Sequence, residues 1–416
     1  MKLIHAALEL APTAVALRVA AAAIVLWHFA PDSAAQHPLW LRQIGTSAAD
    51  TALAGAADGA GGTYVGGGTK GGLAGANAGS TDAWLARYDG AGNQAWLRQI
   101  GGSNSEDTFA VAADGSSGVF ACGATWSDMG GPQAGLGDAW LARFDGAGHP
   151  NWLVQFGSSM EDRPLAAASD GSGGVYLSGS TQGHLGGTNP KPGTYDAWLA
   201  RFDNTGKQAW IVQLGTTADD QAYAAAADGA GGVYVAGRTN LDLAGPSAGF
   251  MDAWLARYDG TGTLVWIRQF GSSESDIVMA ALADGAGGVY LAGDTNGSLG
   301  APNAGFGDPW FARYDAIGNQ LWIRQIGTDF FDGAHALAPN GAGGIFLTGF
   351  THGALGGPGA GFADAWMANY DGAGNALALQ QFGTALSDTA RVAVADSVGG
   401  VFVGGTTEGS LPRHRV

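Results

Sequence analysis

The stretch Asp82–Gly101, DAWLARYDGAGNQAWLRQIG, decides the fold because close copies of it recur along the chain. It reads as an alternating strand (Asp82–Tyr88), a Gly-rich turn and a second strand (Trp96–Ile100). Five further copies begin at Asp138, Asp196, Asp252, Asp308 and Asp364. The starts are 56 or 58 residues apart, and a fixed period of this length is the signature of a repeat architecture.

Each repeat of about 56 residues predicts four strands. Two more strands precede each hairpin, for example Ala222–Ala227 and Gly232–Gly237, joined by a D-G-x-G-G turn in which glycine supplies positive φ. Both faces of Asp82–Tyr88 carry apolar side chains, as expected for a small sheet packed between two others. Four-stranded sheets packed around an axis form a β-propeller. An open β-solenoid is the alternative, but its coils are usually shorter and do not need two hairpin turns.

The count of strands predicts an all-β, seven-bladed propeller whose last repeat is incomplete. The second and fourth strands each appear seven times, the fourth beginning at Trp40, whereas the third appears six times, giving about 27 of 28 strands. Either the strand at Trp40 joins the last two strands in a shared blade, or the seventh blade lacks a strand. Residues 407–411 follow the repeat and Pro412–Val416 depart from it, as in a chain that stops inside a repeat.

The repeat, with D-G-x-G-G-V-Y-V-x-G-x-T, D-A-W-L-A-R-Y-D-G-x-G and W-x-x-Q-x-G in that order, resembles the SBBP family of bacterial β-propeller repeats. The resemblance covers about residues 38–411 and departs at Ala378, which replaces the tryptophan, and at the C-terminal end. It implies a seven-bladed propeller on an exported or cell-surface bacterial protein, often beside other domains. The family has no catalytic motif to carry over to residues of this chain.

Residues 1–35 predict a secretory signal peptide, which leaves residues 36–416 as the propeller. Val19–Ala30 is an apolar core of 12 residues, and Ser33–Ala35 offers a small-x-small cleavage site. The core is short for a membrane span. The predicted location is extracellular or in the cell envelope, without stable membrane insertion after removal of the leader. An uncleaved anchor and an ordinary N-terminal helix are the alternatives.

Composition narrows the classes of partner. The net charge of −17 and the pI near 4.6 argue against nucleic acid, which needs clustered Lys and Arg. The single cysteine, Cys122, excludes an intrachain disulfide. It stands where the other repeats have Gly, Ser, Ala or Thr, so we interpret it as a packing residue and not as a reactive thiol.

Tryptophan and glutamine recur at fixed repeat positions. Twelve of the 14 tryptophans do so, which favours packing between blades, and Asp89–Trp96 is similar to the tryptophan-docking motif of quinoprotein dehydrogenases, one residue shorter. Glutamine occupies all seven equivalent sites of the fourth strand: Gln43, Gln99, Gln155, Gln213, Gln269, Gln325 and Gln381. An amide can bridge backbone groups, so a structural bridge is expected. The alternative is a ring of amides lining the axial channel.

Aspartate recurs at two further positions, where loop carboxylates usually cap turns. One set precedes the first strands: Asp50, Asp107, Asp162, Asp220, Asp276, Asp332 and Asp388. The other opens the third strands: Asp82, Asp138, Asp196, Asp252, Asp308 and Asp364. Calcium binding is the alternative, but calcium needs six to eight oxygens and no D-x-D-x-D-G run is present.

Apparent enzyme motifs are explained by the glycine-rich repeat. Gly245–Gly249 fits G-x-S-x-G, but Ser247 sits at a variable loop position without a strand-to-helix elbow. Gly66–Gly71 fits G-x-G-x-x-G, yet no helix follows. The eight histidines share no repeat position and no metal-ligand spacing. The sequence therefore predicts no catalytic residue, no cofactor and no metal site.

The loops between second and third strands vary most, and the connectivity places them on one rim. They span about residues 68–81, 124–137, 180–195, 238–251, 294–307 and 350–363, and each holds a Leu or Met anchor. Variable loops on a rigid scaffold are a common binding face. The predicted function is a non-enzymatic, exported, monomeric scaffold or binding module for an unidentified protein or glycan. The alternative is a propeller hydrolase or lyase, which should gather polar side chains from non-equivalent positions at one channel mouth.

Overall fold

The computed structural model describes residues 23–29 and 38–410, which contain 28 β-strands and no helix. The strands of the first three blades are β3 (Asp50–Ala57), β4 (Thr63–Thr69), β5 (Asp82–Tyr88), β6 (Gln94–Ile100), β7 (Glu106–Ala113), β8 (Val119–Thr125), β9 (Asp138–Phe144), β10 (Pro150–Phe156), β11 (Asp162–Ser169), β12 (Val175–Thr181), β13 (Asp196–Phe202) and β14 (Gln208–Leu214). Those of the next three are β15 (Asp220–Ala227), β16 (Val233–Thr239), β17 (Asp252–Tyr258), β18 (Leu264–Phe270), β19 (Asp276–Ala283), β20 (Val289–Thr295), β21 (Asp308–Tyr314), β22 (Gln320–Gln325), β23 (Asp332–Pro339), β24 (Ile345–Thr351), β25 (Asp364–Tyr370) and β26 (Ala376–Phe382). The seventh blade combines β27 (Asp388–Ala395) and β28 (Val401–Thr407) with β1 (Ala23–Phe29) and β2 (Trp40–Ile44).

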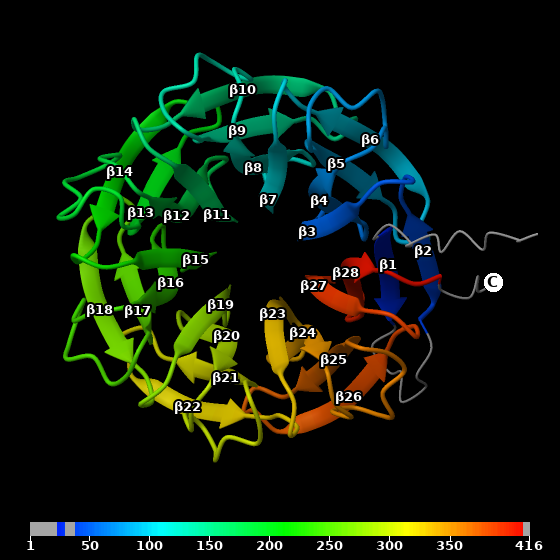
Figure 1. The fold of residues 1–416 in the computed structure, drawn as a ribbon, viewed down its shortest axis with the longest axis vertical. Coiled ribbons are helices and arrows are strands. Elements are labelled where there is room, and N and C mark those ends of the chain that lie inside the picture. Colours follow the sequence, from blue (N-terminus) through cyan, green and yellow to red (C-terminus); the bar gives the residue numbers. More distant parts are fainter. Residues whose placement is uncertain (1–22, 30–37, 411–416) are drawn as a thin grey trace, which may run out of the picture.

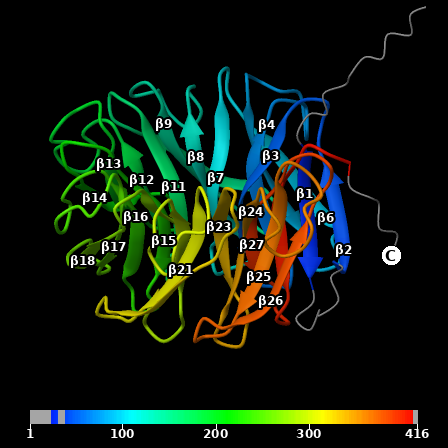
Figure 2. The same ribbon diagram turned by 60° about the horizontal axis from the view of Figure 1, so that its bottom comes forward.

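Seven four-stranded antiparallel sheets stand around one axis, so the predicted seven-bladed propeller is confirmed (Figure 1). The first strand of every blade, from β3 to β27, lies at the axis, and the fourth strand lies at the outside (Figures 1 and 2). Two sets of connections, from second to third strands and from fourth to first strands, meet at one end of the ring, which we call the loop face. Short parallel bridges between them, such as Thr81 with Ser105, show the contact. The hairpin turns occupy the opposite end, the turn face.

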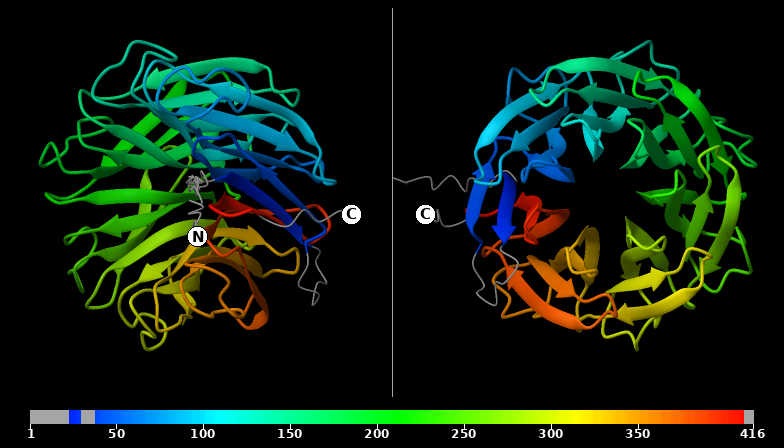
Figure 3. Two further views of the ribbon diagram at one scale, coloured as in Figure 1. Left: turned by 45° about the vertical axis from the view of Figure 1, so that its right-hand side comes forward. Right: turned by 180° about the vertical axis from the view of Figure 1, so that it is seen from behind.

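The seventh blade is closed by the N-terminal end of the chain. β1 pairs with β28 over seven residues and with β2 over five, so it is the third strand that the repeat count did not find. Figure 3 shows β1 and β2 beside β28. The first of the two closure modes is therefore confirmed, with one added strand, and the repeat that stops after β28 is completed from the other end of the chain.

The position of β1 differs from the boundary expected at residue 35. Ala23–Phe29 lies within the apolar run attributed to a signal peptide, but here it fills an inner strand. Ile24 and Leu26 pack against the first blade, whereas Val25, Trp27 and Phe29 pack against the sixth. An apolar run that is buried on both faces looks like a leader in sequence. The rest of the expected leader, residues 1–22 and 30–35, and the C-terminal residues 411–416 lie outside the described residues.

The core consists of seven apolar clusters, each between two neighbouring blades. The third-strand tryptophans are the largest buried side chains, each 0–1% exposed: Trp84, Trp140, Trp198, Trp254, Trp310 and Trp366. One of them is buried at each of six junctions, which explains why DAW is repeated so closely, and Trp27 fills the junction between the sixth and seventh blades. In the part of the chain that the structure covers, no helix could cross a bilayer.

Candidate functional site

The fourth-strand tryptophans dock onto the next blade. Trp96 Nε1 donates to the Gly146 carbonyl at 3.0 Å, and a Cβ built on Gly148 would lie 2.6 Å from the indole. Gly148 also has φ of 78°, so this turn requires glycine. The same bond recurs in the pairs Trp40–Gly90, Trp152–Asn204, Trp210–Gly260, Trp266–Ala316 and Trp322–Gly372. The prediction that these tryptophans serve interblade packing is confirmed.

Ala378 is the exception to this docking. It lies opposite Asn369, as Trp96 lies opposite Arg87, so it stands at the tryptophan position of the sixth blade. Residues 30–37, which link β1 to β2 in the sequence, lie outside the described residues, and their sequence APDSAAQH contains no glycine.

The repeated glutamines bridge loops to strands. Gln99 Nε2 donates to the Gly71 carbonyl at 3.1 Å and to Asp82 Oδ2 at 2.7 Å, while its Oε1 accepts the Ala74 N–H at 2.9 Å. Equivalent bonds hold Gln155, Gln213, Gln269, Gln325 and Gln381. The predicted structural bridge is confirmed. The channel-lining alternative is wrong, because the fourth strands are outermost.

The two sets of aspartates cap loops, as predicted. Asp50 Oδ2 accepts the Thr46 N–H at 2.5 Å, and Asp82 Oδ2 accepts the Ala78 N–H at 3.0 Å. Five of the other six residues of the first set and four of the other five of the second cap in the same way. Asp196 is the exception in the second set, because the equivalent residue Pro192 has no N–H to donate, and Asp196 accepts a hydrogen bond from Gln213 instead. Over residues 23–29 and 38–410, no three His, Cys, Asp or Glu side chains gather around a possible metal position.

The second blade corrects one assignment. Its capping carboxylate is Glu106 and not Asp107, because Glu106 pairs with Thr125 in the register that Asp50 has with Thr69. Glu106 accepts the Gly102 N–H at 2.6 Å and the Thr125 hydroxyl at 2.9 Å. The longer Glu side chain therefore does in the second blade what Asp does in the others. The predicted capping residue, Asp107, lies one position after the actual one. Asp107 does not cap this loop and instead lines a cavity on the loop face. Burial and the nearby Glu106 carboxylate raise the pKa of Asp107.

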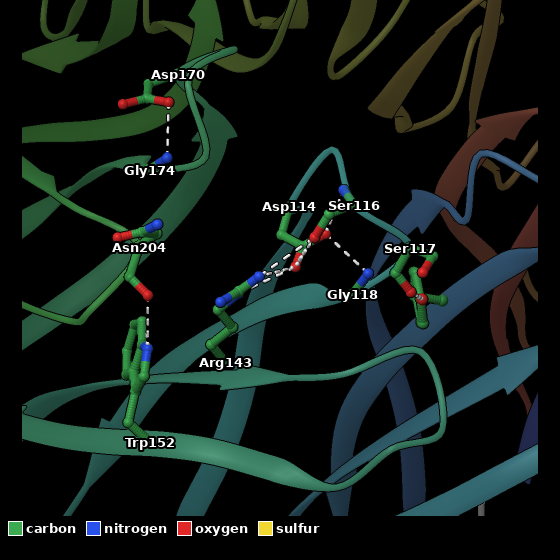
Figure 4. Close-up of polar contacts among 10 residues, drawn as sticks. Asp114, Ser116, Ser117, Gly118, Arg143, Trp152, Asp170, Gly174 and Asn204 are labelled. Carbon is green, nitrogen blue, oxygen red and sulfur yellow. Dashed lines mark hydrogen bonds and ion pairs between the residues drawn. The ribbon is translucent and has the colours of Figure 1, made fainter.

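A cleft on the turn face is built from repeat residues. Figure 4 shows Asp114 accepting the N–H groups of Ser116 and Gly118 and holding Arg143, with Nη2 2.7 Å from Oδ2. Although burial alone would raise the pKa of Asp114, its hydrogen bonds to Ser116 and Arg143 hold the pKa below its usual value. The cleft, of about 290 Å³, extends to Asn204.

The ion pair of Arg143 with Asp114 recurs in four other blades. Equivalent ion pairs join Arg87–Asp58, Arg201–Asp170, Arg257–Asp228 and Arg313–Asp284. These polar groups are therefore structural.

The isolated motifs have local roles. Burial raises the pKa of Cys122 to about 12, which confirms it as an inert packing residue. Ser247 Oγ donates to the Gly249 carbonyl within its own loop. Residues 66–69 of the apparent phosphate loop lie in β4. Nothing in these contacts assembles a nucleophile with a base.

The loop face is asymmetric, although its loops are packed by the predicted anchors. Over the second and third blades, Arg163 lies over the Trp126 ring at 5.9 Å and bonds Glu161, which also accepts the Tyr195 hydroxyl at 2.6 Å. Beside this network, a cavity of about 510 Å³ is lined by Trp126 and Asp107. Trp126 is a non-repeat tryptophan and belongs to the variable loop 124–137 of the predicted binding face.

Exposed aromatic side chains dominate the other half of the loop face. Phe250, Phe306 and Phe362 stand at equivalent loop tips of the fourth to sixth blades and are 72%, 77% and 76% exposed. A Cβ on Gly305, next to Phe306, would lie 2.8 Å from the Phe330 carbonyl, so the backbones of these two loops lie against each other. We call this surface the apolar crescent: Phe250, Phe306, Phe330, Phe331, Phe362 and Leu386.

The axial channel collects a third set of side chains that differ between repeats. Each first strand has a β-bulge at the same place, for example between Ala334 and Ala336, which leaves one residue unpaired. A bulge re-aims the side chain of its extra residue. The seven bulge residues are Leu53, Phe109, Leu165, Tyr223, Met279, His335 and Arg391. The last six line a cavity of about 170 Å³ on the axis.

Sequence reasoning missed this bulge ring, although a signal existed. The seven residues recur with the repeat period, and their side chains differ in chemistry from copy to copy. The bulge itself has no residue signature, because the flanking residues are mostly alanine in all repeats. Only the strand pairing shows that the varied residue is directed at the axis.

Known proteins place the repeat in a family. Residues 265–300 match the model described as SBBP, a beta-propeller repeat. The chain carries the SBBP repeat. The resemblance inferred from the repeat is thereby confirmed, and the 56-residue period extends the SBBP pattern around the ring. A curated relative of this SBBP-repeat chain is "Regulatory protein FlaEY" of Caulobacter vibrioides, 31% identical over 173 residues. The match covers 37% of this chain and 18% of FlaEY.

Several solved structures are similar to this chain at low identity and with TM-scores below 0.5. The structure titled "YCF48 bound to D1 peptide" is 13% identical with a TM-score of 0.41, covering 87% of this chain and 94% of that one. A mutant puromycin hydrolase complexed with PGG is 16% identical with a TM-score of 0.45, covering 84% and 49%. Sqt1 from Chaetomium thermophilum is 13% identical with a TM-score of 0.41, covering 87% and 97%. These similarities concern the fold alone.

Proposed function

We propose that this propeller is a non-enzymatic binding module that holds a protein or glycan ligand on its loop face. The observation that supports the proposal is the asymmetry of that face on an otherwise repetitive scaffold. The apolar crescent exposes Phe250, Phe306 and Phe362 to solvent, where exposed clustered aromatic residues are typical of interaction sites. The turn face, in contrast, repeats the same ion pairs from blade to blade.

The two halves of the loop face suit different ligands. The apolar crescent fits a protein segment with apolar side chains, because burying its phenylalanines removes apolar area from water. The cavity beside Trp126 and Asp107 joins an aromatic wall to a carboxylate, which is the chemistry that packs against and hydrogen-bonds a sugar. We rank the protein ligand first, because three consecutive blades contribute to the apolar crescent.

A ligand array on the purified propeller tests this function. The triple variant Phe250→Ser, Phe306→Ser, Phe362→Ser should lose a captured protein ligand, while Trp126→Ala should lose a captured glycan. Leu264→Ser, an exposed apolar residue on an outer strand, is the matched control and should change neither. Capture that survives both loop-face variants would refute the loop face as the binding surface.

A propeller hydrolase or lyase is the second candidate. The observation in its favour is that His335, Arg391 and Tyr223 come from non-equivalent positions of the channel. No carboxylate stands among the seven bulge residues, so the site offers no acid–base pair of the kind that hydrolysis commonly uses. Hydrolysis of a glycoside or ester that is abolished by His335→Asn would favour this candidate.

Export and the monomeric state complete the proposal. A monomer is consistent with a ring closed by its own N-terminal strand, and the net charge of −17 supports a partner other than nucleic acid. Export is proposed from the leader-like sequence of residues 1–35. Mass spectrometry of the native protein tests it: a start near Gln36 would support export, although it would also remove Ala23–Phe29, and an intact Met1 would contradict it.

A further inference from the structure

The channel cavity is the right size for one small organic molecule. Its volume of about 170 Å³ is close to the ~150 Å³ of an engineered protein cavity that binds benzene. Six of the seven bulge residues line it, and their side chains are not repeated from blade to blade.

Arg391 is an unpaired cation in this cavity. Five repeat arginines on the turn face form ion pairs with aspartates, but no ion pair or hydrogen bond joins Arg391 to another residue of the described chain. Its side chain is solvent-exposed in the channel, yet the surrounding protein lowers its pKa by desolvation. Arginine remains charged in proteins, so an unpaired guanidinium in a confined site favours an anion.

His335, on the neighbouring blade, is a second polar group without a full set of partners. Its Nδ1 is buried and has no hydrogen-bond partner within the described residues. Burial and then the Arg391 charge lower the pKa of His335 to about 3, so the ring is neutral near pH 7. His335 therefore adds no second positive charge, and the cavity holds one cationic group.

Three of the other lining residues are aromatic or aliphatic and belong to blades that do not adjoin the blade of Arg391. Arg391 belongs to the seventh blade, whereas Phe109, Leu165 and Tyr223 belong to the second, third and fourth. The Tyr223 hydroxyl donates to Gln221, which also binds Arg238, so Tyr223 is held in place by its own contacts. The cavity thus combines one cation, Arg391, with aromatic and aliphatic side chains from other blades.

We propose that the axial channel binds a small monocarboxylate, with its carboxylate on Arg391 and a ring-sized apolar body against Phe109, Leu165 and Tyr223. A single carboxylate matches the single cation, and arginine binds carboxylates through two parallel hydrogen bonds. The net charge of −17 disfavours polyanions, which the whole protein would repel. This site goes beyond the loop-face function and uses different residues, so either can fail alone.

Benzoate is the probe. Acetate keeps its carboxylate without the ring, and benzyl alcohol keeps the ring without the carboxylate. Isothermal titration of the full chain should show saturable binding of one benzoate, and acetate and benzyl alcohol should each bind at least about tenfold more weakly. Arg391→Met should weaken benzoate roughly tenfold or more, because a charge-assisted pair is lost. The control Arg268→Met removes an exposed arginine of an outer strand and should leave the affinity unchanged.

Phe109→Ala gives an independent readout of the apolar wall, since it should weaken benzoate but not acetate. Circular dichroism on each variant establishes that it is folded. Equal benzoate affinity in Arg391→Met and Arg268→Met would overturn the proposal, as would no saturable binding at millimolar benzoate. Acetate binding as tight as benzoate would also overturn it, because the site would then hold an adventitious ion only.

Discussion

Removal of β1 is the strongest test of how the ring is closed. We expect a chain that begins at Gln36 to lose the closed propeller, whereas a chain that begins at Ala23 should keep it. Five apolar side chains of β1, namely Ile24, Val25, Leu26, Trp27 and Phe29, are only 0–3% exposed. At about 1.5–3 kcal/mol each, their burial contributes roughly 7–15 kcal/mol, as an upper estimate.

That magnitude matches the whole stability of a typical domain, about 5–15 kcal/mol. The truncation also leaves β28 and β2 without the partner that they share, exposing two strand edges that invite aggregation. His28 would be lost as well, which leaves Asp396 without its 2.7 Å partner on the turn face. The shortened protein should therefore be unstable or associate.

The assay compares the two truncations by guanidinium denaturation and by light scattering after gel filtration. The chain from Ala23 should unfold cooperatively as a monomer. The chain from Gln36 should show a much lower midpoint or oligomers. Equal midpoints and equal monomeric mass for both truncations would refute the reasoning, and would restore a boundary near residue 35.

Three further predictions test individual contacts. Gly148→Ala should lower the melting temperature more than Gly115→Ala, because both glycines have positive φ (78° and 75°) but only Gly148 meets the indole of the preceding blade. Glu106→Ala should lose roughly 1–3 kcal/mol of stability by leaving a buried loop N–H unpaired, whereas Asp107→Ala should lose little; equal effects would refute the corrected assignment. Burial raises the pKa of Asp294 to about 7, above the value of about 4 in an unfolded chain, so ionisation destabilises the fold as pH rises from about 4 through 7. Asp294→Asn should therefore raise the melting temperature more at pH 8 than at pH 5, and a pH-independent difference would contradict this.

The seven-bladed ring could be predicted from the sequence because short local motifs mark the strands and turns of each repeat. Each DAW strand and each D-G-x-G turn satisfies the same packing between blades, so six near-copies determine six near-identical junctions. β1 could not be predicted from the repeat motif because the seventh blade has different residues at the positions of the third strand. His28 replaces the arginine of the ion pair, and Trp27 takes the position of Ala86. Those substitutions preserve burial while removing every letter of the motif except the leucine, which Leu26 retains at the position of Leu85.

The candidate site could not be predicted for the complementary reason. A residue between two blades must fit two neighbours, which restricts each repeat to the same small set of side chains. A residue at the bulge of a first strand faces the channel and contacts no complementary surface, so Leu53, Met279 and Arg391 are equally compatible with the ring. Residues at loop tips, such as Phe306, are exposed to solvent, so packing against a neighbouring blade does not restrict their side chains. Variation between repeats therefore follows the absence of a neighbouring blade, at the loop tips as well as in the channel.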